Sequence, residues 1–147
     1  MAIRIGINGF GRIGRLVYRE AVRRGNFEVV AVNDLVPAHN LAYLVTYDTM
    51  HGRFEHVVRA EGDSLVCDAH STKCLSERDP SALGWGDLGV DVVVESTGFF
   101  TKRDDAAKQL RALGQRRDEK AFAELPLITT ADGQQLSLGD VAIIERR

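Results

Sequence analysis

Residues 3–15 read IRIGINGFGRIGR, in which a short apolar strand pattern runs directly into a glycine-rich turn. Gly9, Gly11 and Gly14 have the G-x-G-x-x-G spacing that begins a dinucleotide-binding unit. In such a unit the first glycine permits a tight turn, the second lets the backbone approach a pyrophosphate, and the third lets helix and strand pack closely. The free amide hydrogens of the first helical turn then face the phosphates. The stretch therefore predicts a strand, a phosphate-binding turn and the start of a helix.

The residues that follow support this interpretation. Apolar residues recur at helical spacing over residues 12–24, and Gly25 is a natural stop signal. Residues 27–33 predict a buried parallel strand, and Asp34 follows it, about 20 residues beyond Gly14. A carboxylate at that distance is expected to bind the ribose hydroxyls of an adenosine. The alternative is a structural strand–helix–strand unit that happens to carry these glycines.

The remainder of the first hundred residues predicts an α/β domain. A second helical pattern follows Pro37, and residues 47–54 are polar enough to predict a loop. Residues 89–95 are the next strong strand, with a glycine-bearing turn at 96–100 and a capping-box pair at 101–104 that predicts a helix. Since ligands of open α/β sheets bind outside the carboxyl ends of strands, the two glycine turns are expected to face one cleft. A small antiparallel insertion is expected from three short apolar runs at residues 57–58, 65–67 and 73–75.

Composition narrows the classes of function. The chain has 147 residues, 44% hydrophobic and 27% charged, as in an ordinary globular domain. Its net charge of −2 argues against a nucleic-acid partner, whose phosphates attract basic proteins. We expect a cytoplasmic protein without a membrane partner, because we find no leader pattern and no apolar run of roughly 20 residues. The four histidines make no metal-ligand spacing, and Cys67 and Cys74 suggest partly buried thiols, so no metal site is predicted.

Residues 1–111 resemble the amino-terminal half of a phosphorylating glyceraldehyde-3-phosphate dehydrogenase. The resemblance implies a Rossmann-like, mostly parallel sheet and NAD as the cofactor. The resemblance extends over most of the chain, and the matching motifs occur in the same order as in the family. The matching stretches are GINGFGRIGR, VNDL, NLAYL, YDTMHGRF, LSERDP, GWGDLGVDVVVESTGFFT and AAKQL.

The resemblance also implies a set of cofactor contacts. The glycine turn would line the pyrophosphate, Asn33 and Asp34 would hold the adenosine ribose, and Arg78 would lie beside the adenine. Residues 96–99 would approach the middle and the nicotinamide of the cofactor. Asp34 favours NAD over NADP, since its carboxylate would repel a 2′-phosphate, whereas a solvated surface charge is the competing interpretation of Arg78. The expected cofactor-binding residues are Gly9, Phe10, Gly11, Arg12, Ile13, Asn33, Asp34, Arg78, Ser96, Thr97, Gly98 and Phe99.

No catalytic residue is predicted. The family would continue with a segment that carries a nucleophilic cysteine, and later with the histidine that activates it, and neither is found here. That mechanism needs a thiolate and a base. Cys67 and Cys74 fall in the insertion, which the family does not use for chemistry, and His51 is expected to be a loop residue rather than a general base. The chain is therefore expected to bind NAD or its adenosine part without oxidising an aldehyde, unless a second chain supplies the missing pair.

Residues 112–147 carry a different pattern, which predicts strands and turns. The stretch FAELPLITTADGQQLSLGDVAIIER is similar to a periplasmic segment of resistance-nodulation-division efflux transporters. We therefore expect one domain over 1–147 that joins a dehydrogenase-like segment to a foreign one, as a recombined or engineered chimera or through a natural frameshift or fusion. The tail strands are expected to complete the sheet beside residues 89–95, and otherwise a strand-swapped dimer or another homo-oligomer is expected. A folded scaffold without cofactor binding is the alternative function.

Overall fold

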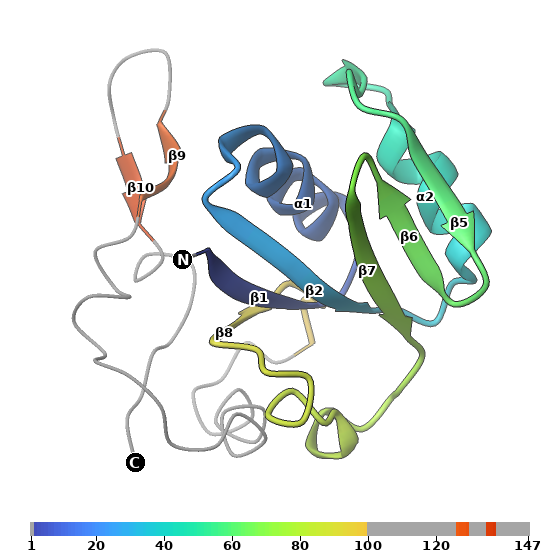
Figure 1. Ribbon diagram of the computed structural model, residues 1–147, viewed down its shortest axis with the longest axis vertical. Coiled ribbons are helices and arrows are strands. Elements are labelled where there is room, and N and C mark those ends of the chain that lie inside the picture. Colours follow the sequence, from blue (N-terminus) through green and yellow to red (C-terminus); the bar gives the residue numbers. More distant parts are fainter. Residues whose placement is uncertain (1, 100–125, 130–134, 138–147) are drawn as a thin grey trace.

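A six-stranded sheet with the order β5-β6-β7-β2-β1-β8 forms the centre of the molecule (Figure 1). The computed structural model describes residues 2–99, 126–129 and 135–137. β2, β1 and β8 are parallel neighbours, β5, β6 and β7 form an antiparallel ribbon, and β7 joins β2 in parallel. The expected mostly parallel sheet with a small antiparallel insertion is confirmed. The strands are β1 Ile3–Asn8, β2 Phe27–Asn33, β5 Val58–Glu61, β6 Ser64–Cys67, β7 His70–Leu75 and β8 Val92–Glu95.

Both helices agree with the sequence pattern. They are α1, Arg12–Arg24, and α2, Ala38–Thr46. α1 ends at Gly25, whose φ of 67° is left-handed and whose N–H donates to the carbonyl of Ala21 at 3.2 Å. α1 packs against β2, and α2 packs against β5 and β6 (Figure 1). The helices thereby cover one face of the sheet with a single apolar core.

A smaller cluster covers the opposite face. Trp85 is fully buried there with Leu83 and Val90, after the short 3-10 helix η1, Pro80–Ala82. The indole lies directly on Gly6 of β1, where an added Cβ would come within 2.7 Å of the ring. A polar-flanked tryptophan in the sequence is thus a core residue, because the strand beneath it has no side chain at that position.

The polar stretch predicted as a loop is instead a short hairpin, and that expectation is wrong. β3, Tyr47–Asp48, pairs antiparallel with β4, Gly52–Arg53. Asp48 Oδ1 accepts hydrogen bonds from the N–H groups of Met50 and His51 at 2.9 and 2.8 Å. A side-chain carboxylate that binds the next backbone amides closes a tight turn, so the hairpin forms without apolar alternation.

The described tail residues form a separate hairpin. β9, Pro126–Thr129, pairs antiparallel with β10, Gln135–Ser137. Neither of these two strands pairs with β8. The prediction that the tail strands complete the sheet beside β8 is therefore wrong for β9 and β10. Strands separated by a short connection pair at a small loop-closure cost, which favours the local hairpin. The helix predicted to begin at residues 101–104, and the other strands and turns predicted for the tail, lie outside the described residues.

In the part of the chain that the structure describes, no helix combines the length and the apolar character that a membrane crossing requires.

Candidate functional site

The predicted site residues gather at one edge of the sheet. Asn8 is in register with Asn33 on β2 and with Glu95 on β8, so these three parallel strands end side by side. The glycine turn follows β1, Asp34 follows β2, and residues 96–99 follow β8. Three segments that are far apart in the chain therefore meet where an open α/β sheet binds its ligands (Figure 1).

The three glycines of the motif have three different surroundings. Gly9 has a φ of 89°, and a Cβ there would lie 2.4 Å from the backbone nitrogen of Thr97. A Cβ on Gly14 would lie 2.2 Å from the carbonyl oxygen of Gly9. A Cβ on Gly11 would meet nothing within 4 Å. Gly9 and Gly14 are thus required by packing within the protein, whereas Gly11 leaves open space at the tip of α1.

The first turn of α1 borders that open space. Its N-cap is Gly11, which has no side chain to cap the helix, and the first turn carries no acidic residue. The first amides of a helix have no partners inside it, and they carry the positive end of the helix dipole. Arg12 and Ile13 are exposed at this tip, Ile13 by 60%. The arrangement is that of an anion site built from main-chain groups.

Asp34 lies against the glycine turn. Its Oδ2 accepts the N–H of Phe10 at 2.9 Å, and its Oδ1 accepts the N–H of Val36 at 3.1 Å. The carboxylate is therefore fixed at the tip of the first helix, where the sequence spacing predicted it. It stays partly exposed, so further lone pairs of its oxygens are open to a ligand hydroxyl.

Two expected contact residues point into the protein instead. Phe10 is 1% exposed and packs edge-on against Tyr18, so only its main chain lies at the turn. Asn33 is 5% exposed, and its side-chain amide bonds Asn8 Oδ1 and both main-chain groups of Glu77, each at 2.8 Å. Contact of these two residues with the cofactor stays a prediction from the resemblance, and in the structure both side chains pack or bond within the protein.

The turn after β8 is attached to the glycine turn. Ser96 Oγ donates to the carbonyl of Gly9 at 2.6 Å, and the N–H of Ser96 donates to the carbonyl of Asn8 at 2.7 Å. Gly98 has a left-handed φ of 77°, and Phe99 is 84% exposed beside it. The predicted residues 96–99 thus lie beside the glycine turn, with an exposed aromatic ring at the end of the described segment.

Arg78 is placed at the same edge by the segment that follows β7. The amide N–H of Arg78 donates to Glu77 Oε1 at 2.9 Å, and Glu77 itself is bonded to Asn33. The side chain of Arg78 is exposed. The structure therefore leaves both interpretations of Arg78 open, a ligand contact and a solvated charge.

Sequence reasoning missed a chain of hydrogen bonds beneath the site. Glu95 Oε2 accepts from Asn8 Nδ2 at 2.8 Å, and Asn8 Oδ1 accepts from Asn33 Nδ2 at 2.8 Å. Glu95 Oε1 also accepts from the N–H of Thr97 at 2.8 Å and from its hydroxyl. The signal that could have revealed it is a polar residue, Asn or Glu, at the last position of each of the three strands.

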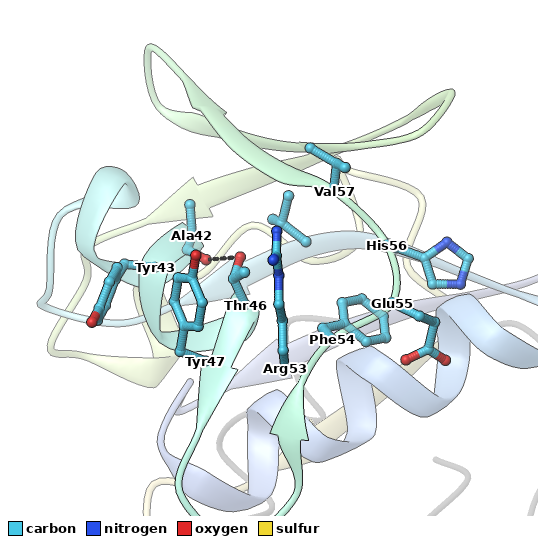
Figure 2. A pocket seen from close by; sticks show the side chains of 10 residues that line it. Ala42, Tyr43, Thr46, Tyr47, Arg53, Phe54, Glu55, His56 and Val57 are labelled. Atoms are coloured by element: carbon cyan, nitrogen blue, oxygen red, sulfur yellow. Dashed lines mark hydrogen bonds between the residues drawn. The ribbon is translucent and has the colours of Figure 1, made fainter.

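A cavity of about 500 Å³ lies elsewhere, between α2 and the segment that precedes β5 (Figure 2). Tyr43 and Tyr47 are exposed there, with ring centroids 4.9 Å apart, and Arg53 lies over the Tyr47 ring. None of the expected cofactor-binding residues lines this cavity. Its lining residues are Ala42, Tyr43, Thr46, Tyr47, Arg53, Phe54, Glu55, His56, Val57 and Val58.

The two cysteines have the environment of structural thiols. Cys67 is fully buried and Cys74 is half-buried. Burial raises the pKa of each thiol to about 11, so both are protonated near neutrality. His51, the other chemically active side chain considered from sequence, bonds Asp48 Oδ1 through Nδ1 at 3.0 Å on the exposed hairpin.

Comparison with known proteins agrees with this geometry. Residues 3–103 match the family model described as glyceraldehyde 3-phosphate dehydrogenase, NAD binding domain. The chain is 55% identical over 112 residues to a glyceraldehyde-3-phosphate dehydrogenase of Geobacillus stearothermophilus, with 76% of this chain and 33% of the relative covered. For the cytosolic glyceraldehyde-3-phosphate dehydrogenase of Trypanosoma brucei brucei, the identity is 52% over 112 residues, with 76% and 34% covered.

The chain thus spans about one third of the length of the relatives it matches. The matched region contains every residue of the site described above. The cofactor of this domain is NAD. Taken together, the strand-end geometry and the family match show that the chain belongs to the glyceraldehyde 3-phosphate dehydrogenase family and carries its NAD-binding domain.

Proposed function

We propose that NAD binds at the edge formed by the glycine turn, Asp34 and residues 96–99. The pyrophosphate would lie over Gly11, where the backbone is open, and would accept hydrogen bonds from the first amides of α1. The adenosine ribose would bond the carboxylate of Asp34, and Arg78 would lie by the adenine. Residues 96–99 would face the middle and the nicotinamide of the cofactor. The observation that carries this proposal is the bond between Asp34 and the Phe10 amide, because it joins a sugar-binding carboxylate to a phosphate-binding turn.

We further propose that this site prefers NAD to NADP. The Asp34 carboxylate is held in place by two amides, so it cannot turn away from a 2′-phosphate without losing both bonds. Two negative charges at contact distance repel each other, and partial shielding from water strengthens that repulsion. The preference therefore follows from a fixed carboxylate rather than from charge alone.

Titration calorimetry of the whole chain with NAD tests both statements. Replacement Asp34→Ala should weaken NAD binding by about 1.5 to 3 kcal/mol, since a charged hydrogen-bond acceptor is lost. The same replacement should reduce the difference in binding affinity between NAD and NADP. Asp63→Ala is the matched control, because Asp63 is exposed in the turn between β5 and β6. No heat at millimolar NAD with the unaltered chain would favour the alternative of a folded scaffold.

Aldehyde oxidation is proposed to need residues beyond those of this chain. The chain corresponds to one third of the named dehydrogenases, and both of its cysteines are protonated thiols in the antiparallel ribbon or at its border with β2. A thiohemiacetal mechanism requires a thiolate with a base beside it. An assay of NADH formation with the chain alone should show no turnover. Turnover would contradict this proposal, and if it persisted in both Cys67→Ala and Cys74→Ala, the reaction would not use a cysteine of this chain.

The tail is proposed to have a separate origin from the matched domain. The family model ends at residue 103, and the matches with relatives extend over 107 to 115 residues. The similarity to an efflux-transporter segment remains a prediction from sequence. Limited proteolysis should remove residues 112–147 while leaving the NAD-binding region intact, and equal protection of the two parts would contradict this proposal.

A homo-oligomer in the cytoplasm is the proposed working form. Tyr43, Tyr47, Met50 and Val57 are exposed by 47 to 75% on one side of the molecule, around the cavity of Figure 2 and the β3–β4 hairpin. Exposed apolar side chains in such number commonly mark a protein interface. Light scattering on the purified chain should give more than the monomer mass, and a double variant Tyr43→Ser with Tyr47→Ser should shift it towards the monomer.

A further inference from the structure

The antiparallel ribbon carries three side chains of metal-ligand type that the NAD site does not use. His56 precedes β5, Cys67 ends β6, and Asp68 begins the turn to β7. A ring nitrogen, the Sγ atom and a carboxylate oxygen of these residues lie within 4.8 Å of one another. Among the residues that the structure describes, they are the one group of this kind. Cys67 and Asp68 are neighbours in the chain, and the pairing of β5 with β6 brings His56 beside them.

The group combines a fixed ligand with two adjustable ones. Cys67 is fully buried on the core side of β6, so its sulfur is held by packing. The side chains of His56 and Asp68 are 30% and 54% exposed, which leaves a solvent path to the group. His56 Nδ1 and Asp68 Oδ2 are 2.6 Å apart, and the imidazole packs 5.0 Å from the Phe54 ring. The two partly exposed side chains are therefore the first that a cation from solvent would meet, and the buried sulfur lies within 4.8 Å of their polar atoms.

The backbone of the turn supports this arrangement. Asp68 has a φ of 52° and is the one non-glycine residue in the described segments with a positive φ. A residue with a side chain in this region is uncommon, and such conformations cluster at sites where the surroundings fix them. In this conformation Asp68 Oδ2 lies 2.6 Å from His56 Nδ1.

We propose that His56, Cys67 and Asp68 bind a divalent cation of the zinc class, with water as the fourth ligand. Sulfur, imidazole and carboxylate are the three ligand types of Zn²⁺, and a three-ligand site with one open position is common for this ion. Bond lengths of about 2.0 to 2.3 Å in a tetrahedron place the ligand atoms roughly 3.3 to 3.7 Å apart. The ligand atoms lie within 4.8 Å of one another, and His56 Nδ1 and Asp68 Oδ2, now 2.6 Å apart, would separate to admit the ion.

A nucleophilic cysteine is the competing use of the same three residues. Burial, with the nearby Asp68 carboxylate as a second cause, raises the pKa of the Cys67 thiol to about 11. A reactive cysteine requires the opposite shift, because the thiolate is the nucleophile. A bound cation changes the balance directly: the S–H proton leaves to solvent as the sulfur–metal bond forms.

Cobalt titration of the full chain under reducing conditions tests the site. Co²⁺ bound through a thiolate gives a sulfur-to-metal absorption band in the near ultraviolet, and we expect one equivalent that Zn²⁺ displaces. Cys67→Ala should abolish the band, and the surface variants His56→Gln and Asp68→Asn should weaken binding by about tenfold or more. Cys74→Ala and His51→Gln are the matched controls, because they remove the other cysteine and the other histidine paired with an aspartate.

Absence of the band at millimolar Co²⁺ would overturn the proposal, as would a band that survives Cys67→Ala or disappears with Cys74→Ala. If Cys67→Ala does not fold, the two surface variants decide, since neither side chain is buried. NAD calorimetry on each variant reports whether the domain remains native. The outcome is independent of the proposed cofactor site, which shares no residue with this group.

Discussion

The two halves of the central sheet use polar groups in different ways. In the nucleotide half, formed by β2, β1, β8 and their following turns, main-chain groups and inward-facing amides contact one another closely. In the lateral half, formed by α2, β5–β7 and residues 47–57, polar side chains pair mostly at the surface. Parallel neighbours end together and so build a site from backbone, whereas antiparallel ribbons bring side chains together across turns. The nucleotide half should therefore be sensitive to one added methyl group, and the lateral half should tolerate most single changes.

The strongest test of this contrast is Gly9→Ala. An added Cβ would lie 2.4 Å from the Thr97 backbone, at a φ of 89° that disfavours any side chain. Overpacking and backbone strain together should lower the free energy of unfolding by about 3 to 5 kcal/mol. Gly62→Ala is the control, since Gly62 has a φ of 57° but open space around it, and should cost only about 1 kcal/mol. Equal losses of stability for Gly9→Ala and Gly62→Ala in urea unfolding would mean that crowding by the turn after β8 contributes nothing.

The next test concerns Arg19, which is an exception to this difference. It is a buried charged side chain that bonds the lateral half, where most polar side chains pair at the surface. Its guanidinium is 1% exposed and donates to the carbonyls of Val45 and Gly52 at 2.8 and 3.1 Å. Arg19→Ala should cost about 2 to 4 kcal/mol in urea unfolding, because two carbonyls lose their donor. Arg23→Ala, at a side chain that is 42% exposed, should cost less than about 1 kcal/mol. A larger loss of stability for Arg23→Ala than for Arg19→Ala would show that burial of the arginine does not determine its contribution.

A smaller effect is expected for Glu95→Gln. Three donor atoms from Asn8 and Thr97 bond the carboxylate, so an amide NH₂ in its place would point at a donor. We expect a loss of about 1 to 3 kcal/mol in stability and weaker NAD binding, since the turn after β8 would shift. Glu28→Gln is the surface control, because its pair with Arg4 at 3.4 Å is 41% exposed on both sides. If Glu95→Gln left the NAD affinity unchanged, the hydrogen bonds beneath the site would contribute nothing to cofactor binding.

The smallest effect is a pH dependence in the lateral half. Hydrogen bonding to Arg23 lowers the pKa of Glu55 to about 2, from an ordinary value of 4.5. A carboxyl whose pKa is lowered by folding stabilises the native state above 4.5, and this contribution is lost as the pH falls towards 2. Thermal melts between pH 6 and 2.5 should therefore fall less steeply for Glu55→Gln than for the unaltered chain. Glu61→Gln, at a pair 4.0 Å apart and over 60% exposed, should leave the slope unchanged.

The parts of the fold that could be predicted from sequence are those determined by neighbouring residues. The glycine spacing, the helix stop at Gly25 and the position of Asp34 are all local, and the structure agrees with each. The contacts of Asn33 could not be predicted, because Glu77 lies 44 residues away and only the pairing of β7 with β2 brings it near. The inward direction of Phe10 depends on Tyr18, which lies about one helical turn beyond Gly14.

The lateral half was the less predictable one for a related reason. The polar segment between α2 and β5 has no apolar periodicity, and its hairpin depends on one carboxylate, Asp48, that binds two amides. The group of His56, Cys67 and Asp68 has no spacing that matches a known metal motif, because the ribbon and not the local chain assembles it. Patterns in sequence report periodic burial, and they do not report which side chains meet across a turn.

The hydrogen bond between Asp34 and the Phe10 amide has a kinetic consequence. Because the carboxylate holds the turn through the protein's own groups, the cradle is pre-organised and little ordering entropy is spent on binding. Cofactor should then associate and leave quickly without a slow rearrangement step. The Phe10 amide should exchange its hydrogen slowly in the free protein, and saturation with NAD should change that rate very little.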